Sequence, residues 1–282
     1  MKTVKITDDG QWKEQIRDFR RKYGKVETNC FLLPGDYREL VRTKEVVSWE
    51  NENCLLFLVQ EKGFGQVYYF MAGAPKISLP PEPGILLMDL VSRSAGGEDL
   101  PALARPWMEA GFGLYKSYMR MELPLTEKTE EIEADPQLHF GCGICSLDEV
   151  EDLWQNALDP FDSPLPQIEE IRAQAEADNL FWVSGQGRIL AALLMKPQNA
   201  GCLLQHIAVR QECRGQGIAG KLMNYALGKM KERDIRICRL WVAEQNTSAV
   251  RAYEKMRFKK DGMYSVKYIF RRKGSFLYGS RA

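Results

Sequence analysis

The chain has 282 residues, which is long for one domain and suits two domains of ordinary size. Hydrophobic residues make up 45% and charged residues 27%, a composition typical of globular proteins with enough apolar side chains for a core. The formal net charge is +1, so charge offers no argument for a nucleic acid or a membrane surface as partner.

The start of the chain and its apolar runs give no indication of secretion or membrane insertion. No apolar run follows residues 1–5, and the stretch 189–195, among the longest, is far too short to span a membrane. Seven scattered cysteines argue against a disulfide framework. Cys142 and Cys145 have metal or redox spacing, but no second pair or histidine cluster accompanies them. We expect a cytoplasmic protein with reduced thiols and no metal.

Apolar periodicity in the first half predicts a strand, two helices and a hairpin, then a strand, a helix and a strand. The expected elements are a strand at 4–6, a helix through Trp12, Ile16 and Phe19, a helix from Asp36 through Leu40 and Val41 to Val47 and Trp49, strands at 55–59 and 67–70, a strand at 85–91, a helix at 99–110 and a strand at 115–123.

An acidic segment separates the two halves. Residues 124–137 contain five acids and one lysine, are bounded by prolines, and have few large apolar side chains. This composition predicts a linker at 125–137 between domains at 1–124 and 138–282. Residues 249–282 contain ten Lys or Arg and two acids, which suits a phosphate-rich ligand or a solvated surface equally.

The second half has a clearer pattern, which predicts a mixed α/β layer fold. The expected elements are a strand at 139–145, a helix that begins at the capping-box pair Ser146 and Glu149, a helix through Ile168, Ile171 and Ala175, a hairpin of strands 180–184 and 189–195, a strand at 203–209, a long helix to Arg233, a strand at 235–243, a helix at 247–256 and a strand at 263–270. The first half shares the early order, strand, two helices and hairpin. We therefore expect a degenerate internal duplication, with a central mixed sheet in each half.

The most informative stretch is a glycine-bearing turn between the strand at 203–209 and the long helix. Gly215 and Gly217 allow the backbone to approach a ligand closely, and Arg214 adds a fixed cation. Unpaired N–H groups and the positive end of a helix come together at such a turn. The turn is therefore a predicted anion site, best suited to phosphate.

The same residues match the G-x-G-x-x-G pattern of dinucleotide-binding folds, which alone is a weak signal. A dinucleotide turn should follow its strand almost at once and open a βαβ unit. Here five polar residues separate Val209 from Gly215, and a hairpin precedes the strand. These features argue against a dinucleotide site.

Two motifs resemble the GCN5-related N-acetyltransferases (GNAT). The stretch 214–219, Arg-Gly-Gln-Gly-Ile-Ala, is similar to the acetyl-CoA motif R/Q-x-x-G-x-G/A, with Gln211 or Glu212 as its first polar position. The stretch 246–258 is similar to the family's Asn-x-x-Ala-x-x-x-Tyr helix, except that Arg257 replaces the usual glycine before Phe258. The resemblance covers about 138–272. Tandem members occur in this superfamily, commonly with one half unable to bind cofactor.

This resemblance implies a binding mode for acetyl-CoA as acyl donor, without a metal. It places the pantetheine along the strand backbone and the pyrophosphate at the glycine turn. Asn246 would cap the last helix and also touch the cofactor arm; a cap alone is the alternative for this residue. The implied cofactor-binding residues are Ile207, Ala208, Val209, Arg214, Gly215, Gln216, Gly217, Ile218, Ala219 and Asn246.

The resemblance also assigns a catalytic role to Tyr253, which would protonate the departing thiolate of CoA; core packing is the alternative. The general base stays open between His206, Glu244 and a base that acts through water. His206 titrates in the right range, but a single histidine in a strand is commonly structural. The expected function is an acetyl-CoA-dependent N-acetyltransferase acting by direct amine attack, with its active site in the C-terminal half.

The alternative function is a non-catalytic CoA-binding sensor or interaction module. The acceptor is expected to be a small-molecule or peptide amine, and neither nucleic acid nor membrane is expected. Asp159 and Asp162, between the first two helices of the second half, could attract an amine or form ordinary turns. The sequence leaves open the acceptor, the acyl chain length, the role of the N-terminal half and the oligomeric state.

Overall fold

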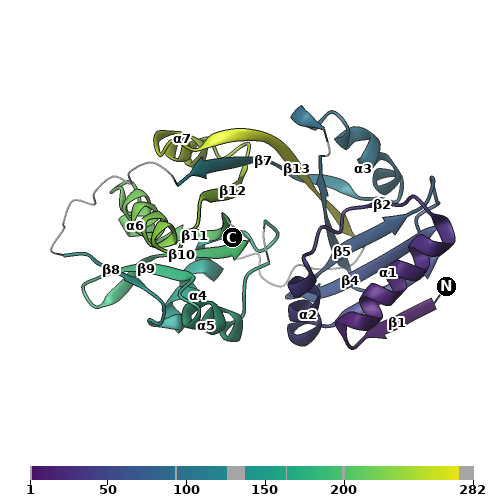
Figure 1. Cartoon of the computed structure of the whole chain (residues 1–282), viewed down its shortest axis with the longest axis horizontal. Helices are drawn as coiled ribbons and strands as arrows, with labels where there is room; N and C mark the ends of the chain where they lie inside the picture. The colour runs from purple at the N-terminus through teal and green to yellow at the C-terminus, as the bar shows by residue number, and fades with distance from the viewer. Residues whose placement is uncertain (1, 93, 126–136, 163, 199–200, 273–282) are drawn as a thin grey trace. The chain divides into compact units, whose positions relative to one another are not determined.

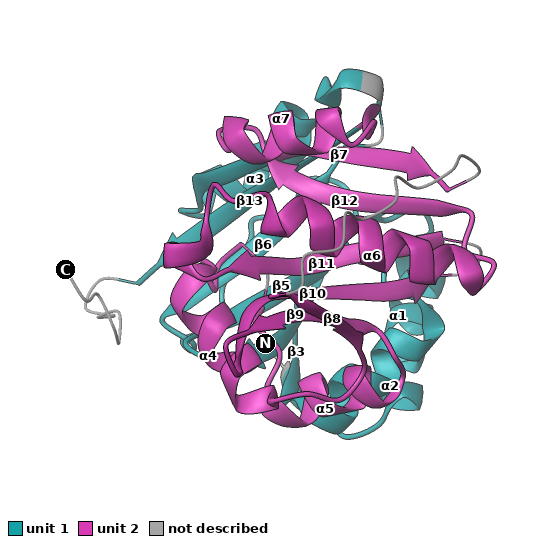
Figure 2. Ribbon diagram, turned by 90° about the vertical axis from the view of Figure 1, so that its left-hand side faces the viewer, with its two compact units in different colours: residues 1–117, 263–282 teal, residues 118–262 magenta. Residues whose placement is uncertain are grey.

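The computed structural model describes residues 2–92, 94–125, 137–162, 164–198 and 201–272. The chain forms two compact units, residues 1–117 with 263–282 and residues 118–262 (Figure 2). These units divide the chain at 117/118 and 262/263, whereas the sequence-based domains meet at 125–137; those domain borders stay a prediction. Residues 126–136 of the predicted linker lie outside the described residues.

The first unit follows most of the order predicted from the sequence, with two strands that were not predicted, at residues 27–28 and 46–51. Its elements are β1 (Lys2–Ile6), α1 (Asp9–Tyr23), β2 (Glu27–Thr28), α2 (Pro34–Thr43), β3 (Val46–Asn51), β4 (Cys54–Glu61), β5 (Phe64–Met71), β6 (Ile85–Val91) and α3 (Leu100–Glu109), with residues 263–271 of β13 (Lys259–Arg271). The sheet order is β1-β3-β4-β5-β6-β13, and among the described residues of this sheet only β5 and β6 pair in parallel.

The helices of the first unit cover both faces of its sheet (Figure 1). Trp12 of α1 is fully buried and stacks on Phe57 of β4, with ring centroids 5.0 Å apart. Trp107 of α3 is also fully buried and contacts Tyr69 of β5. Because neighbouring residues of a strand face opposite sides, these two cores lie on opposite faces of the sheet.

The second unit contains the elements predicted for the C-terminal half, except the last strand, predicted at 263–270, which belongs to the first unit. They are β8 (His139–Cys142), α4 (Leu147–Ala157), α5 (Ile168–Glu176), β9 (Leu180–Gly185), β10 (Arg188–Gln198), β11 (Gly201–Val209), α6 (Ile218–Glu232), β12 (Ile237–Ala243) and α7 (Thr247–Lys255), with residues 118–124 of β7 (Gly113–Pro124). The sheet order is β7-β12-β11-β10-β9-β8, and in the part of this sheet that the structure describes only β11 and β12 pair in parallel. The predicted fold class, mixed α/β layers around a mixed sheet, is confirmed.

Opposite faces of the second sheet are covered by α4 and by α6. Trp154 of α4 packs with Leu180 of β9 on one face. Tyr225 of α6 contacts Phe181, the next residue of β9, on the other face. The helix that follows the glycine turn is therefore anchored by packing from Ile218 to Met230, and the exposed residues 214–217 lie directly before its first turn.

Two details predicted from the sequence are wrong. Val47 and Trp49 lie on strand β3, because the chain is extended from Lys44 onward and pairs with β4. Ser146 precedes α4 without a side-chain capping bond, and the Glu149 carboxylate accepts the Ile189 amide at 2.9 Å instead. In both places a strand from elsewhere in the chain supplies the hydrogen-bond partners.

Candidate active site

Strands β11 and β12 separate at their carboxyl ends. Their parallel register runs from Gly201↔Ile237 to Leu204↔Leu240 and stops, although β11 continues to Val209 and β12 to Ala243. On its other side β11 stays paired with β10 to Val209, with a bulge at Gln205. A bulge bends the strand that carries it. Residues 205–209 thus have an edge that faces away from β10 and is not paired with β12, called here the open edge.

The open edge presents backbone groups of Ile207 and Val209. The Arg210 amide donates to the Leu190 carbonyl at 2.9 Å, so Arg210 faces β10. Successive residues of a strand direct their N–H and C=O groups to alternate edges, so Ala208 also faces β10 and Ile207 and Val209 face away. The strand backbone can therefore pair with an extended polar chain laid between β11 and β12, as the resemblance implies.

A short loop with two left-handed glycines leads from β11 into α6. A 3-10 turn, η2 (Gln211–Cys213), is followed by extended Arg214, and Gly215 and Gly217 have φ values of 77° and 76°. An added Cβ at either glycine would meet nothing within 4 Å, so the positive φ, and not crowding, favours glycine here.

The first turn of α6 begins at Gly217 without a side-chain cap. Its leading amides have no intrahelical acceptor, and the helix dipole adds partial positive charge at the same place. The residues from Arg214 to Gly217 are exposed, whereas Ile218 is buried and fixes the helix to the core. An exposed amide cradle on an anchored helix fits the pyrophosphate of acetyl-CoA.

Contacts that the sequence did not suggest hold this loop in place. Glu149 of α4 accepts from Ile189 and also contacts the Arg210 guanidinium at 3.4 Å, which ties the end of β11 to α4. Arg214 Nε donates to the Val209 carbonyl at 3.2 Å, folding this side chain back along the loop. Partners 40 or more residues apart, such as Glu149 with Ile189 and Arg210, carry no local sequence signal.

A small cavity of about 200 Å³ adjoins the start of α6. Its polar lining comes from the β9–β10 turn, the loop and the first turn of α6, and includes Gln186, Arg188, Gln216 and Lys221. Arg188 is paired with Glu212 at 3.1 Å, and the Gln216 amide donates to the Glu212 carbonyl at 3.1 Å. These contacts stiffen the loop from the side of the hairpin.

Tyr253 lies on α7 and is half-buried against Phe258, with ring centroids 5.8 Å apart. Burial raises the pKa of its phenol to about 12, with a smaller contribution from Cys238 of β12. At neutral pH Tyr253 is therefore protonated and can act only as a proton donor. Asn246 caps the same helix, its side chain accepting the Ala249 amide at 3.1 Å, as predicted.

The two candidate bases have opposite environments. His206 is 6% exposed and packs on Trp154, with ring centroids 5.4 Å apart. Burial lowers the pKa of His206 to about 4, so the ring is neutral at pH 7 but weakly basic. Glu244 is exposed immediately after β12. His206 lies in β11 and Glu244 directly follows β12, so each residue is close to the point at which these two strands separate.

The loop after α4 contacts the outer strand of this sheet. The Tyr118 hydroxyl of β7 donates to Asp162 Oδ1 at 2.8 Å, and Asp159 Oδ1 accepts the Phe161 amide at 2.9 Å. Asp159 thus forms the turn that the sequence left as one possibility, and Asp162 also links the loop to β7. Tyr118 pairs with Ala243 at the end of β12, beside the separating strands.

In the described ranges, no three His, Cys, Asp or Glu side chains gather in a way that could hold a metal ion. Within those ranges every cysteine is unpaired, including Cys142 and Cys145. None of the described helices is both long and apolar enough to cross a membrane.

Comparison with known proteins relates this geometry to a family. Residues 147–258 match the acetyltransferase (GNAT) family. No curated protein matches the chain. Among solved structures, the chain is similar to a GCN5-related N-acetyltransferase from Sphaerobacter thermophilus, with 14% identity, a TM-score of 0.63 and 98% of each chain covered.

Two further structures show the same likeness over the full length. A tandem GNAT protein from the clavulanic acid biosynthesis pathway has 11% identity, a TM-score of 0.62 and 99% of each chain covered. A GNAT-family acetyltransferase from Colwellia psychrerythraea has 13% identity and a TM-score of 0.55, over 96% of this chain and 100% of that one. The resemblance inferred from the sequence is confirmed to this extent: residues 147–258 match the GNAT family, and the chain has the fold of GNAT proteins.

Proposed function

We propose that the chain is an acetyl-CoA-dependent N-acetyltransferase whose active site lies in the second unit, between the ends of β11 and β12. The observation that carries this proposal is the open edge of β11 leading directly into the uncapped, glycine-bearing start of α6. An extended polar arm and a pyrophosphate are the two parts of acetyl-CoA that these features suit. The GNAT match over 147–258 supports the same assignment.

The backbone of Ile207 and Val209 would pair with the pantetheine arm, and the amides from Gly215 to Ala219 would hold the pyrophosphate. Bound acetyl-CoA supplies an activated thioester. When an amine attacks its carbonyl, negative charge grows on the oxygen, and a fixed backbone N–H at the open edge stabilises that charge. One such donor is worth about 10²–10³ in rate.

Tyr253 completes the proposed reaction as the general acid. A new C–N bond forms as the C–S bond breaks, and Tyr253 donates its proton to the departing sulfur. The attacking amine loses a proton to His206, Glu244 or water. The low pKa of His206 and the exposure of Glu244 favour a base that acts through water.

The acceptor is proposed to be a primary amine of a small molecule or peptide. Asp162, held by Tyr118, places a carboxylate on the α4 side of the sheet close to the end of β12. A carboxylate at that place attracts a protonated amine before it is deprotonated for attack.

Calorimetry with acetyl-CoA tests the proposal. Wild-type protein should bind, and Gly217→Glu should abolish binding, since it strains a left-handed residue and adds negative charge at the phosphate cradle. Gly73→Glu is the matched control, because Gly73 has φ of 70°, equally open space and a position in the first unit. Absence of wild-type binding, or equal binding by Gly217→Glu, would refute the proposal.

A turnover assay separates the enzyme from the CoA-binding sensor that the sequence left as an alternative. Release of free thiol is followed with a panel of amines, amino acids and peptides. Amine-dependent thiol release supports the enzyme. Tight binding without release across the whole panel would favour the sensor.

A further inference from the structure

The first unit contains a strand separation like that of the second. Strands β5 and β6 hold the positions of β11 and β12 in the sheet order, and they too are its parallel pair. Their register includes only Gly65↔Leu86 and Gln66↔Leu87, although β5 continues to Met71 and β6 to Val91. Strand β4 pairs with the opposite edge of β5 over its full length. The edge of residues 67–71 beyond β4 therefore corresponds to the open edge of β11.

In the first unit this edge is paired with the chain itself. Strand β2 pairs antiparallel with β5, Glu27 opposite Met71 and Thr28 opposite Phe70. The Thr28 hydroxyl donates to the Tyr69 carbonyl, and the Tyr69 hydroxyl donates to Glu27 Oε1 at 3.0 Å. Both backbone and side chains thus join β2 to β5.

The pairing of residues 27–29 with β5 and β6 is called here the seal. Asn29 completes it with a side chain that bonds to both separating strands. Its Nδ2 donates to the Val67 carbonyl at 3.0 Å and to the Asp89 carbonyl of β6 at 3.1 Å. Its Oδ1 accepts the Tyr69 amide at 2.8 Å. Asn29 is 8% exposed, so these bonds are made away from water. The side-chain amide satisfies the kind of backbone groups that the pantetheine arm would meet in the second unit.

The phosphate cradle is also missing from the first unit. Residues 72–84, all of them described, connect β5 to β6 without any helix, where α6 follows β11 in the second unit. The first unit therefore presents no helix N-terminus at the carboxyl end of β5.

We propose that Glu27, Thr28 and Asn29 occupy the cleft of the first unit that corresponds to the acyl-CoA cleft of the second, so that the chain holds one acetyl-CoA. The comparison rests on the proposed function of the second unit. The seal gives the first unit a paired strand edge in place of a ligand. Two features then prevent the first unit from binding the cofactor. The segment between α1 and α2 fills the cleft, and the glycine loop is missing.

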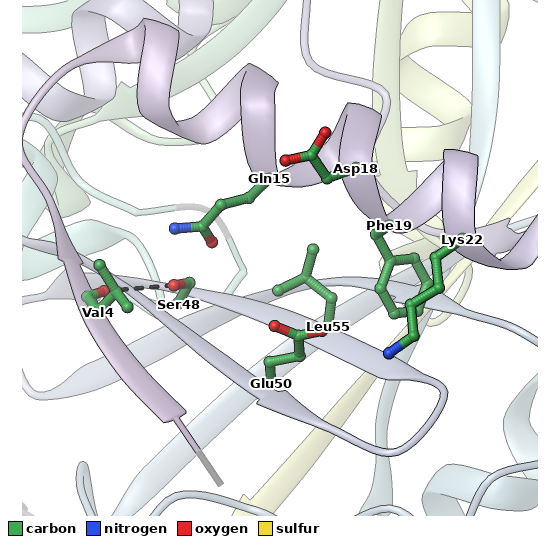
Figure 3. A pocket seen from close by; sticks show the side chains of 8 residues that line it. All are labelled: Val4, Gln15, Asp18, Phe19, Lys22, Ser48, Glu50 and Leu55. Atoms are coloured by element: carbon green, nitrogen blue, oxygen red, sulfur yellow. Dashed lines mark hydrogen bonds between the residues drawn. The ribbon is translucent and has the colours of Figure 1, made fainter.

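The cavity of about 240 Å³ in the first unit lies elsewhere (Figure 3). Gln15 and Lys22 of α1 face strands β1, β3 and β4, which contribute Val4, Ser48 and Leu55. No residue that lines it belongs to β5 or β6. This cavity is therefore not a second acyl-CoA cleft.

Binding stoichiometry tests the single-site statement. Native mass spectrometry with acetyl-CoA should give one ligand per wild-type chain and none for Gly217→Glu. Two ligands on the wild type, or one retained by Gly217→Glu, would overturn it. If neither the wild type nor Gly217→Glu binds acetyl-CoA, the proposed function and the single-site statement are both refuted. The seal is then tested by hydrogen exchange, which needs no ligand.

Hydrogen exchange tests the seal without any ligand. The Tyr69 amide should be protected in the wild type and should exchange about tenfold faster or more in Asn29→Ala, because its acceptor is removed. Asn156→Ala, which removes an exposed asparagine that bonds Asp152 on α4, is the control and should leave Tyr69 unchanged. Fast exchange of Tyr69 in the wild type, or equal rates in wild type and Asn29→Ala, would overturn the occupied cleft.

Discussion

Tyr253 is the residue on which the proposed chemistry depends most. Its phenol, with a pKa of about 12, stays protonated throughout the range in which enzymes commonly work. Tyr253→Phe keeps the ring against Phe258 and removes only the proton. We expect kcat to fall by about 10²–10³ while the Kd of acetyl-CoA changes less than about twofold. Steady-state kinetics with calorimetry measures both.

Tyr225→Phe is the control for loss of a hydroxyl. Tyr225 lies on α6 in the same unit and contacts Phe140 and Phe181. Its variant should keep wild-type kcat. If Tyr253→Phe instead raised KM with kcat unchanged, Tyr253 would be a packing residue.

His206 makes the stability of the second unit sensitive to acid. Its folded pKa is about 4, below the ordinary 6.5, so the unfolded chain takes up the proton first as pH falls. The stabilisation is complete above pH 6.5 and is lost as pH falls from about 6.5 to 4. Between pH 7 and pH 5 the expected loss is about 2 kcal/mol of the unfolding free energy.

Urea unfolding at both pH values measures this loss. His206→Gln replaces the ring with a side chain that does not titrate, so the variant should lose about 2 kcal/mol less than the wild type over the same interval. Carboxylates elsewhere contribute equally to both proteins and cancel in the difference. Equal losses would mean that His206 is solvated in the folded protein.

At the scale of elements, α7 depends on its cap. Asn246→Ala removes the bond to the Ala249 amide and should cost about 1 kcal/mol of unfolding free energy, whereas Asn246→Asp should cost little. Asn246 is also a proposed cofactor contact, and the same pair of variants tests that role. Contact with acetyl-CoA predicts weaker binding in both variants, while a cap alone predicts weaker binding only in the less stable one.

Sequence patterns predicted the elements that depend on local signals. Alternation and turn residues located the β9–β10 hairpin, and the glycine loop was recognised because Gly215 and Gly217 must adopt positive φ. The cap at Asn246 was predicted for the same reason, since its bond spans three residues. Features that depend on residues close together in the sequence can therefore be predicted from the sequence alone.

Long-range pairing accounts for what the sequence did not predict. Strand β2 has only two residues and is defined by its pairing with β5. A segment of this length has no periodicity from which a strand could be predicted. Glu149 bonds Ile189, 40 residues away, and so forms no capping box. The low pKa of His206 likewise depends on burial against Trp154 of another element.

At the scale of the molecule, the two halves of the sequence share most of their order of elements, apart from β2 in the first half and α6 in the second, and they exchange their last strands. In each half, the last helix, α3 or α7, is followed by a strand that ends in the other unit. Residues 118–124 of β7 pair with β12, and residues 265–271 of β13 pair with β6. Each sheet therefore needs chain from both halves to complete its hydrogen bonding.

This exchange predicts how the protein behaves when it is made as two polypeptides. Residues 1–125 alone would leave β6 without β13, and residues 137–282 alone would leave β12 without β7. Unpaired edges of this length are sites of aggregation. We expect each fragment alone to be poorly soluble, and the two to copurify when coexpressed with a tag on one, because each supplies the strand that the other lacks. The copurified pair should bind acetyl-CoA like the intact chain. A fragment 137–282 that is monomeric, as stable as the intact chain and free of 1–125 on size-exclusion chromatography would show that β7 is dispensable to the second sheet.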